Sequence, residues 1–390
     1  MIYLDYNATT PCDPEVLQAM LPYFTEKFGN AGSKTHTFGW KADEAVEQAR
    51  RQVADLINAV PQELVFTSGA TESCNLAIKG VYETYARKGR NHIITCRTEH
   101  NAVLDTCKNL EGKGAEVTYL EVDKDGLIDT GTLAGAITER TALIVIMYAN
   151  NETGVLQPVQ DIGAIAKKHK VLFFTDATQA VGKISVDVLE DQVDLLALSA
   201  HKIYGPKGVG ALYCRRRNPR VQLTEQNNGG GQERGLRSGT LNVPGIVGFG
   251  KACSILKEKR VQEEKKLRFL RDTLEQSFLK ESFIFVNGGH AKRLPNVSNV
   301  AFEGVRAPSL VSALNHQFAF SLGSACTAAV QRPSHVLKAM GLPESRINAS
   351  VRISIGRFTE EKDIKMTETA FIKAAKYLRD EAQHEYLISD

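Results

Sequence analysis

The sequence lacks the features of a disulfide-bonded or zinc-binding protein. Its 7 cysteines are scattered at positions 12, 74, 96, 107, 214, 253 and 326, with no Cys-x-x-Cys pair and no zinc-like spacing to histidine. Neither a disulfide framework nor a structural metal is therefore expected. Most cysteines in such a chain are small buried hydrophobic residues, so a reactive one needs support from its surroundings.

Long hydrophobic runs and an excess of one charge are also missing. The longest apolar run, near 142–149, is far shorter than the ~20 residues of a membrane span. The N-terminus has neither the basic start nor the apolar stretch of a signal peptide. The 48 Lys and Arg against 45 Asp and Glu give a net charge of +3, too close to balance to indicate nucleic-acid binding. We expect a cytoplasmic protein without membrane or direct nucleic-acid contact.

What is present is the pattern of an α/β enzyme. Short β-branched runs alternate with amphipathic stretches through the middle of the 390 residues. Runs that are apolar almost throughout, such as 142–147, suit strands covered on both faces of a mostly parallel sheet. The predicted strands are 64–67, 92–95, 116–120, 143–148, 171–176 and 195–199, and the predicted helices are 71–88, 100–112, 132–137 and 159–168.

A helical pattern rich in charge extends from 245 to 278. It has few helix breakers and many opposite charges at helical spacing. We interpret it as a solvated helix that joins a large domain, residues 15–257, to a smaller α+β domain. The smaller domain is predicted to comprise residues 1–14 and 258–390.

Polar clusters follow several of the predicted strands, and ligands bind at the carboxyl ends of strands in α/β sheets. The segment 67–72 runs from a strand through glycine into a helix start, where backbone N–H groups and the Thr71 hydroxyl would cradle a phosphate. The same residues also fit an ordinary capping box.

Two further strand ends carry a carboxylate and an amine. Asp176, after an apolar strand, needs a partner such as a protonated heterocyclic nitrogen. Lys202, beside Ser199 and His201, suits Schiff-base formation if burial lowers its pKa; the alternative is a surface lysine. With His100 after another strand, these are the groups that pyridoxal phosphate needs: a lysine, a carboxylate, a phosphate cradle and a ring cover.

Further motifs extend along the chain. They are YLDYNATTP at 3–11, SGATES at 68–73, TEH at 98–100, NNETG at 150–154, DATQ at 176–179, SAHKIYGPK at 199–207, GGG at 229–231, RGLRSGT at 234–240, SLGSACT at 321–327 and SVRIS at 350–354. With them the chain resembles, nearly end to end, the cysteine desulfurases of the IscS/NifS group. This group belongs to the class V aminotransferases of pyridoxal phosphate fold type I. The resemblance implies a mostly parallel mixed sheet between helices, plus a smaller α+β domain.

The resemblance implies pyridoxal 5′-phosphate as coenzyme and assigns residues to its ring. Lys202 matches the lysine that binds the coenzyme covalently, and Asp176 matches the partner of the ring nitrogen. Gln179 matches the donor to the phenolate oxygen. His100 matches the imidazole stacked on the ring, and Asn151 a hydrogen-bond partner beside it.

The phosphate contacts follow from the same resemblance. Ala70, Thr71, Ser199 and His201 match the phosphate ligands of one subunit. Thr240 matches a phosphate contact that the second subunit supplies, which implies a homodimer.

The substrate is implied to be L-cysteine. Arg352 matches the arginine that grips the substrate carboxylate, a role that suits a bidentate guanidinium. The candidate substrate-binding residues with it are Asn7, Asn30 and Asn151. Cys326 matches the nucleophile that attacks the substrate sulfur, so Cys326, Lys202 and His100 are the candidate catalytic residues. Ordinary aminotransferases need no cysteine at this place.

The implied reaction converts L-cysteine to L-alanine and leaves sulfur as a persulfide on Cys326, for handover to an acceptor protein. Because the chain ends at Asp390 without the C-terminal extension of housekeeping members, we expect a dedicated sulfur donor. Iron–sulfur cluster assembly, tRNA thiolation and DNA phosphorothioation are the candidate pathways. The alternatives are a selenocysteine lyase, another fold type I enzyme, or a non-catalytic scaffold.

Overall fold

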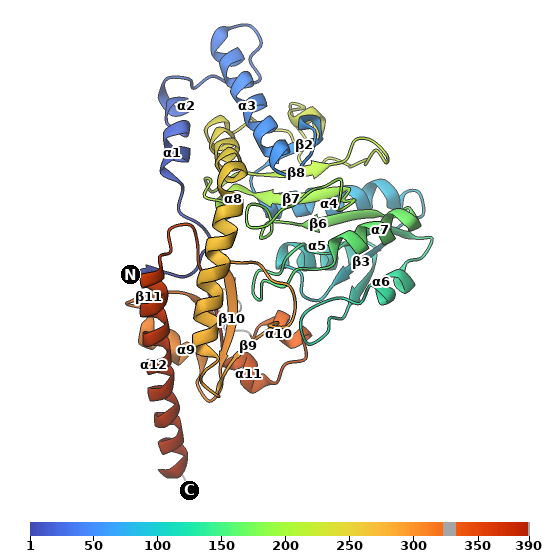
Figure 1. Ribbon diagram of the computed structural model, residues 1–390. Coiled ribbons are helices and arrows are strands. Elements are labelled where there is room, and N and C mark those ends of the chain that lie inside the picture. Colours follow the sequence, from blue (N-terminus) through green and yellow to red (C-terminus); the bar gives the residue numbers. More distant parts are fainter. Residues whose placement is uncertain (323–332, 389–390) are drawn as a thin grey trace.

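The computed structural model describes residues 1–322 and 333–388 and contains a central mixed sheet (Figure 1). Its strand order is β2-β8-β7-β6-β5-β3-β4. Among these strands β8 alone runs opposite to the other six, so the expected mostly parallel mixed sheet is confirmed. The strands are β2 (Leu64–Thr67), β3 (His92–Cys96), β4 (Glu116–Leu120), β5 (Thr141–Val145), β6 (Leu172–Asp176), β7 (Leu195–Ser199) and β8 (Gly210–Cys214).

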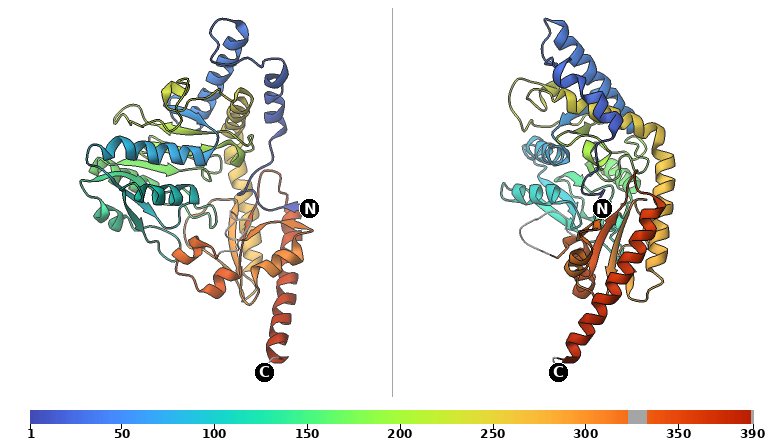
Figure 2. Two further views of the ribbon diagram at one scale, coloured as in Figure 1. Left: turned by 180° about the vertical axis from the view of Figure 1, so that it is seen from behind. Right: turned by 90° about the vertical axis from the view of Figure 1, so that its left-hand side faces the viewer.

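Helices cover both faces of this sheet, which Figure 2 shows from behind and from the side. Successive strand residues point to opposite faces: Ile144 packs in one core cluster, while Leu143 and Val145 pack in the other. One face is covered by α4 (Ala70–Ala86) and α5 (Asn101–Glu111). The other is covered by α3 (Thr37–Leu56), α6 (Thr130–Ala136), α7 (Val159–His169) and the first half of α8 (Val243–Phe278).

The strand predicted at 143–148 is the least accurate of the expected boundaries, because β5 is Thr141–Val145. The apolar run continues beyond the strand, and its backbone still bonds to β6. Ile146 N–H donates to the carbonyl of Phe174, and Tyr148 N–H donates to that of Asp176. Regular pairing with β6 ends at Val145 and Phe174, so the apolar residues after Val145 lie outside the strand.

The predicted charged helix is α8, one continuous helix that begins after an Asn242 cap, but it is not solvated throughout, because apolar residues such as Phe249 and Phe278 are buried. Its first half packs in the core of the large domain through residues such as Leu256. Its second half, from Leu267, belongs to a separate cluster that also contains Leu4 near the N-terminus. This change of core supports the predicted division at 257/258, which stays a prediction.

The smaller domain surrounds a four-stranded sheet of order β12-β13-β10-β9. Its paired strands are antiparallel, and a short parallel pair, β1-β11, lies beside it. The strands are β1 (Ile2–Tyr3), β9 (Ile284–Val286), β10 (Val297–Phe302), β11 (Phe318–Ala319), β12 (Ser321–Leu322) and β13 (Ser350–Ser354). The remaining helices are α1 (Pro14–Met20), α2 (Pro22–Thr25), α9 (Ala307–Leu314), α10 (His335–Ala339), α11 (Glu344–Asn348) and α12 (Glu361–Ile388).

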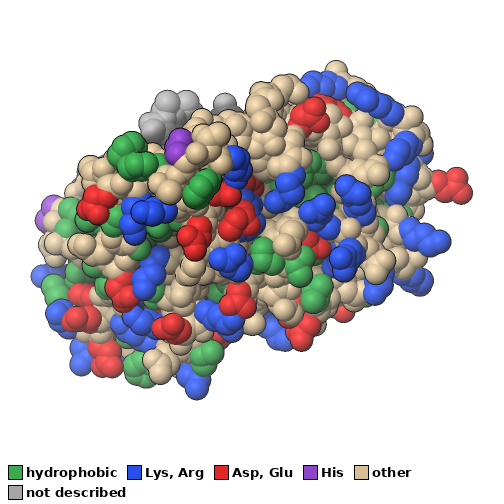
Figure 3. Space-filling view, turned by 90° about the horizontal axis from the view of Figure 1, so that it is seen from above, with side chains coloured by type: hydrophobic (Ala, Val, Ile, Leu, Met, Phe, Trp, Pro, Cys, Tyr) green, Lys and Arg blue, Asp and Glu red, His purple; other side chains and the backbone are tan. Residues whose placement is uncertain are grey.

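The surface carries both signs of charge. In Figure 3 basic and acidic side chains intermingle over the left-hand part of the face shown, as the near balance of charge leads one to expect. No helix within the described ranges is long and apolar enough to cross a membrane.

Candidate active site

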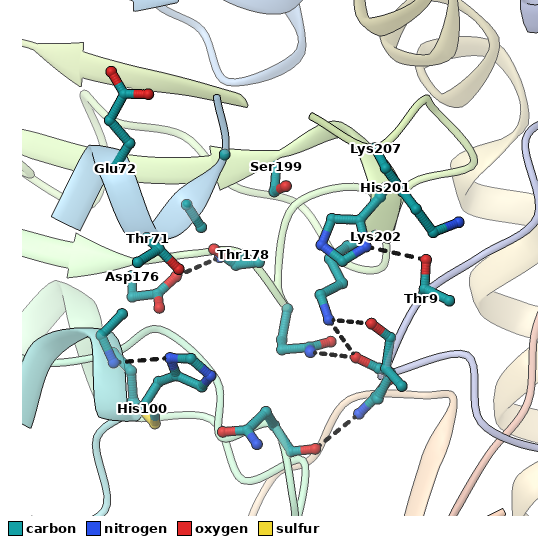
Figure 4. Close-up of a pocket in the computed structure, with 18 of the residues that line it drawn as sticks. Thr9, Thr71, Glu72, His100, Asp176, Thr178, Ser199, His201, Lys202 and Lys207 are labelled. Atoms are coloured by element: carbon teal, nitrogen blue, oxygen red, sulfur yellow. Dashed lines mark hydrogen bonds between the residues drawn. The ribbon is translucent and has the colours of Figure 1, made fainter. Parts of the chain in front are cut away.

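A pocket of about 600 Å³ opens where β2, β3, β5, β6 and β7 end, at the edge that faces the smaller domain. This volume falls within the range of small-molecule sites. In Figure 4 Thr71, His100, Asp176, Ser199 and Lys202 face one central space. The predicted site residues that line it are Asn7, Ala70, Thr71, His100, Asn151, Asp176, Gln179, Ser199, His201, Lys202 and Arg352.

The start of α4 forms one wall of the pocket. Its N-cap is Gly69, with φ +153° and no side-chain cap from the described chain, so the first N–H groups are left for a ligand. The Glu72 carboxylate turns back and accepts from Ser68 N–H at 2.7 Å, one residue before the N-cap, so the alternative capping box is not formed. Gly210 lies so close that an added Cβ would stand 2.7 Å from Gly69 Cα.

Lys202 follows β7 and reaches into the pocket from its base. Its Nζ donates to the backbone carbonyls of Asn7 and Ala8, at 2.6 and 2.7 Å (Figure 4). The first residues of the chain thus hold the amine that the sequence assigns to the coenzyme. Because its amine lies in the pocket, Lys202 is not the surface lysine that the sequence analysis gave as the alternative.

Asp176 and Gln179 stand at the end of β6. The Oδ1 atom of Asp176 accepts from Thr178 N–H at 3.0 Å, and only 8% of this residue is exposed. Gln179 Nε2 donates to the Asn7 carbonyl at 3.0 Å. A carboxylate in so dry a position requires a polar or positive partner, which a protonated ring nitrogen supplies.

His100 caps α5 through its ring. The Nδ1 atom accepts from Ala102 N–H at 3.1 Å, so a neutral ring carries its proton on Nε2.

The preceding Glu99 is fully buried, and burial raises the pKa of its carboxyl to about 8. It accepts from Met147 N–H and from the Cys96 thiol.

His201 is a neutral donor beside the cradle. Burial, followed by the charges of Lys202, Lys207 and Lys183, lowers its pKa to about 4. Its Nδ1 pairs with Thr9 Oγ1 at 3.1 Å.

Arg352 reaches the pocket from β13 of the smaller domain, with only 2% of the residue exposed. Its Nη2 donates to Asp5 Oδ1 at 2.8 Å, and Nη1 donates to the Asn151 carbonyl at 3.2 Å. Glu152, next along the chain, is buried, and burial raises its pKa to about 7. Its Oε2 accepts from Ser334 Oγ at 2.5 Å.

Three predicted residues are not part of this pocket as described. Asn30 is exposed in the turn before α3, where its side chain accepts from Gly32 N–H. Thr240 is exposed before α8. Cys326 lies outside the described residues.

The sequence reasoning missed several polar groups around the pocket. Thr9, Thr178 and Lys207 line it, and only the motifs that contain them gave any signal. Glu99 and Glu152 also lie in quoted motifs, but nothing in the sequence showed that their carboxyl groups are buried, and Lys183 lies in no quoted motif.

These walls fit a phosphorylated pyridine. The uncapped start of α4, with Thr71 and Ser199, suits a phosphate. The buried carboxylate of Asp176 suits a ring nitrogen that carries a proton, and Lys202 provides the amine. The donor set matches the requirements of pyridoxal 5′-phosphate.

Comparisons with known proteins agree with this fit. The class V aminotransferase family model matches residues 2–366. The cysteine desulfurase IscS of Anaeromyxobacter sp. (strain Fw109-5) is 51% identical over 380 residues, which cover 97% of this chain and 93% of the relative. A solved NifS-like protein has a TM-score of 0.90 at 37% identity and covers 97% of this chain and 100% of its own. The solved complex of SspA with cysteine has a TM-score of 0.80 at 39% identity, with 92% and 100% covered.

The chain belongs to the class V aminotransferase family, and its coenzyme is pyridoxal 5′-phosphate. Within that family its similarity is to the cysteine desulfurases of the IscS/NifS group. Both the predicted family and the predicted fold type are confirmed.

Proposed function

We propose that the chain is a cysteine desulfurase that converts L-cysteine to L-alanine and holds the sulfur as a persulfide on Cys326. The observation that carries the proposal is the meeting of Lys202, Asp176 and Arg352 on one pocket. The desulfurase relatives, and the structure of SspA with cysteine, support L-cysteine as the substrate.

Residues of different charge bind different parts of the coenzyme and of the substrate. Pyridoxal 5′-phosphate, when bound, withdraws electrons from Cα of the substrate. The Asp176 carboxylate would pair with the ring nitrogen, and the α4 N-terminus with Ser199 and neutral His201 would hold the phosphate. Arg352 orients the substrate carboxylate with its guanidinium.

Lys202 and Cys326 carry the chemical steps. Lys202 Nζ takes the proton from Cα of the substrate. The Cys326 thiolate then attacks the substrate sulfur, so that an S–S bond forms and the Cβ–S bond breaks. The electron pair of the broken bond stays with the carbon skeleton, which takes up protons and leaves as alanine. The persulfide passes to a sulfur-acceptor protein.

We propose a homodimer as the working unit. Aromatic side chains are exposed on the arm formed by α1, α2 and α3, at the top of Figure 1. Phe24, Phe28, Phe38 and Trp40 are between 47% and 63% exposed. Such a patch is typical of a protein interface. The exposed Thr240 is then available to the phosphate site of the second subunit. Sedimentation of a single monomeric species at micromolar concentration would contradict this arrangement.

The sulfur-acceptor pathway stays a prediction from the sequence, with iron–sulfur cluster assembly, tRNA thiolation and DNA phosphorothioation as candidates. The cytoplasmic location likewise stays a prediction. Pull-down of acceptor proteins with the persulfide form would identify the pathway.

The decisive experiment incubates the holoenzyme with L-cysteine and a thiol reductant and measures alanine and sulfide. We expect both products from the wild type and from Cys12→Ala, since Cys12 is not in the pocket lining. Cys326→Ala is expected to form neither. Products from this variant at the wild-type rate would instead support a lyase that needs no cysteine nucleophile. A wild type without the visible absorption of bound coenzyme would support a scaffold.

A further inference from the structure

Lys183 is a buried lysine just behind the pocket, in the turn that follows β6. Only 9% of the residue is exposed. Burial lowers its pKa well below the ordinary value, and the charges of Lys202 and Arg352 lower it further. No anion is among the groups that shift the pKa of Lys183. Since burial of a lysine in such a place is unfavourable, the position calls for a role beyond packing.

The Nζ atom of Lys183 contacts the carbonyl end of a carboxamide. It donates to Gln179 Oε1 at 2.5 Å. The two ends of a carboxamide have similar shapes but opposite hydrogen-bonding character. A charged lysine has donors and no acceptor, so this contact holds the oxygen of Gln179 toward Lys183. The N–H₂ end then faces away from Lys183, where it donates to the Asn7 carbonyl at 3.0 Å and where Gln179 lines the pocket.

A second contact links Lys183 to Asn7, whose backbone carbonyl accepts a hydrogen bond from Lys202. Its Nζ donates to Asn7 Oδ1 at 3.4 Å, and Asn296 Nδ2 donates to the same oxygen at 3.0 Å. The backbone carbonyl of Asn7 accepts from both Gln179 and Lys202. Lys183 therefore contacts both Gln179 and Asn7, the residue whose backbone carbonyl positions the Gln179 amide and the Lys202 amine.

We propose that Lys183 is a positioning residue for the coenzyme: it fixes the Gln179 carboxamide with its N–H₂ group toward the phenolate oxygen of pyridoxal 5′-phosphate. Lys183 itself lies outside the pocket lining and acts through Gln179. The inference rests on the proposed function for the place of the coenzyme next to Gln179. It assigns a role to a residue that neither the motifs nor the pocket lining identifies.

A double-mutant cycle on coenzyme binding tests the proposal. Lys183→Met, Gln179→Ala and the double variant are compared with the wild type for two quantities. One is the dissociation constant of pyridoxal 5′-phosphate, and the other is the pH midpoint of the visible absorption of the bound coenzyme. In the wild-type background we expect Lys183→Met to weaken binding by about tenfold and to shift the midpoint by about one pH unit. In the Gln179→Ala background we expect it to change neither.

Two further variants separate positioning from folding. Lys183→Arg keeps N–H donors and is expected to restore both quantities toward wild type. Lys251→Met removes a surface lysine that pairs with Glu15, and should change neither. Should Lys183→Met fail to fold, Lys183→Gln takes its place in the cycle. Because its own amide presents either end to Gln179, the same losses are expected.

Wild-type affinity and midpoint in Lys183→Met, or losses that add in full to those of Gln179→Ala, would overturn the inference and leave the proposed function intact. A wild type that binds no pyridoxal 5′-phosphate would overturn both. The two failures are therefore distinguishable.

Discussion

Arg352 and Asp5 form an ion pair across 347 residues of chain, with Nη2 of the arginine 2.8 Å from Oδ1 of the aspartate. The pair ties the N-terminal segment to β13 at the edge of the pocket. The side chain of Arg352 is 2% exposed and that of Asp5 19% exposed. The guanidinium proposed to bind the substrate carboxylate is therefore already held by a carboxylate of the protein.

Asp5→Asn should destabilise the fold, because it leaves the buried guanidinium without its anion. A charge-assisted bond of this kind contributes about 1.5–3 kcal/mol, and we expect a loss of that order in urea unfolding of the holoenzyme. Asp43→Asn is the matched control, since Asp43 pairs with Lys34 on the open surface and should change stability by less than about 1 kcal/mol. Equal losses in the two variants would contradict this account.

Arg50 offers a second comparison, because it pairs with two glutamates of different burial. The Glu233 side chain is 1% exposed and that of Glu47 is 47% exposed. Glu233 also accepts from Phe66 N–H at 2.8 Å. We expect Glu233→Gln to cost about 3–5 kcal/mol and Glu47→Gln less than about 1 kcal/mol in urea unfolding. A smaller loss for Glu233→Gln than for Glu47→Gln would be the contrary result.

The close approach of Gly210 to the phosphate cradle predicts a steric effect on binding. A Cβ at this position would lie 2.7 Å from both Gly69 Cα and the Leu198 carbonyl oxygen. Gly210→Ala should lower stability by about 1–3 kcal/mol and weaken coenzyme binding by roughly tenfold, as β8 moves away from the cradle. Gly135→Ala, whose Cβ meets nothing within 4 Å in α6, should be neutral or stabilising by up to about 1 kcal/mol. Unchanged coenzyme affinity in Gly210→Ala would refute the steric argument.

Glu99 makes stability depend on pH in a defined direction. Burial raises its pKa from 4.5 to about 8, so between these values the folded state keeps a proton that the unfolded state has lost. Its contribution to stability therefore falls as pH rises through this window, by up to about 1.4 kcal/mol per unit, and is constant above it. Glu99→Gln removes the dependence.

Urea unfolding of the holoenzyme at pH values across that window measures the effect. The stability of Glu99→Gln relative to wild type should increase steadily with pH. Exposed Glu139, changed to Gln in the same way, should give a flat difference. A flat difference for Glu99→Gln as well would mean that its carboxyl is ionised throughout.

The strand-end residues could be predicted because the topology of α/β proteins collects them. His100, Asp176, Ser199 and Lys202 each end or follow a buried strand, and parallel strands end at one edge of a sheet. Alternating patterns also placed most of the predicted strands and helices within one or two residues of those found, whereas β8 and α3 were not predicted.

The buried charges could not be predicted, because lysine and glutamate are mostly exposed and their local sequence carries no sign of burial. Lys183 is enclosed by Asn7, which is 176 residues away, and Glu152 by Ser334, which is 182 residues away. Such contacts depend on which distant segments fold together.

Because α8 contributes to both hydrophobic cores without a break, the two domains share one continuous helix. At 1.5 Å per residue its 36 residues span about 54 Å. The predicted boundary at 257/258 falls inside this helix, so cutting there would leave each fragment with half a helix and one exposed apolar stripe. The two cores are therefore coupled through one helix, and we expect loss of either core to destabilise the part of α8 that packs in the other.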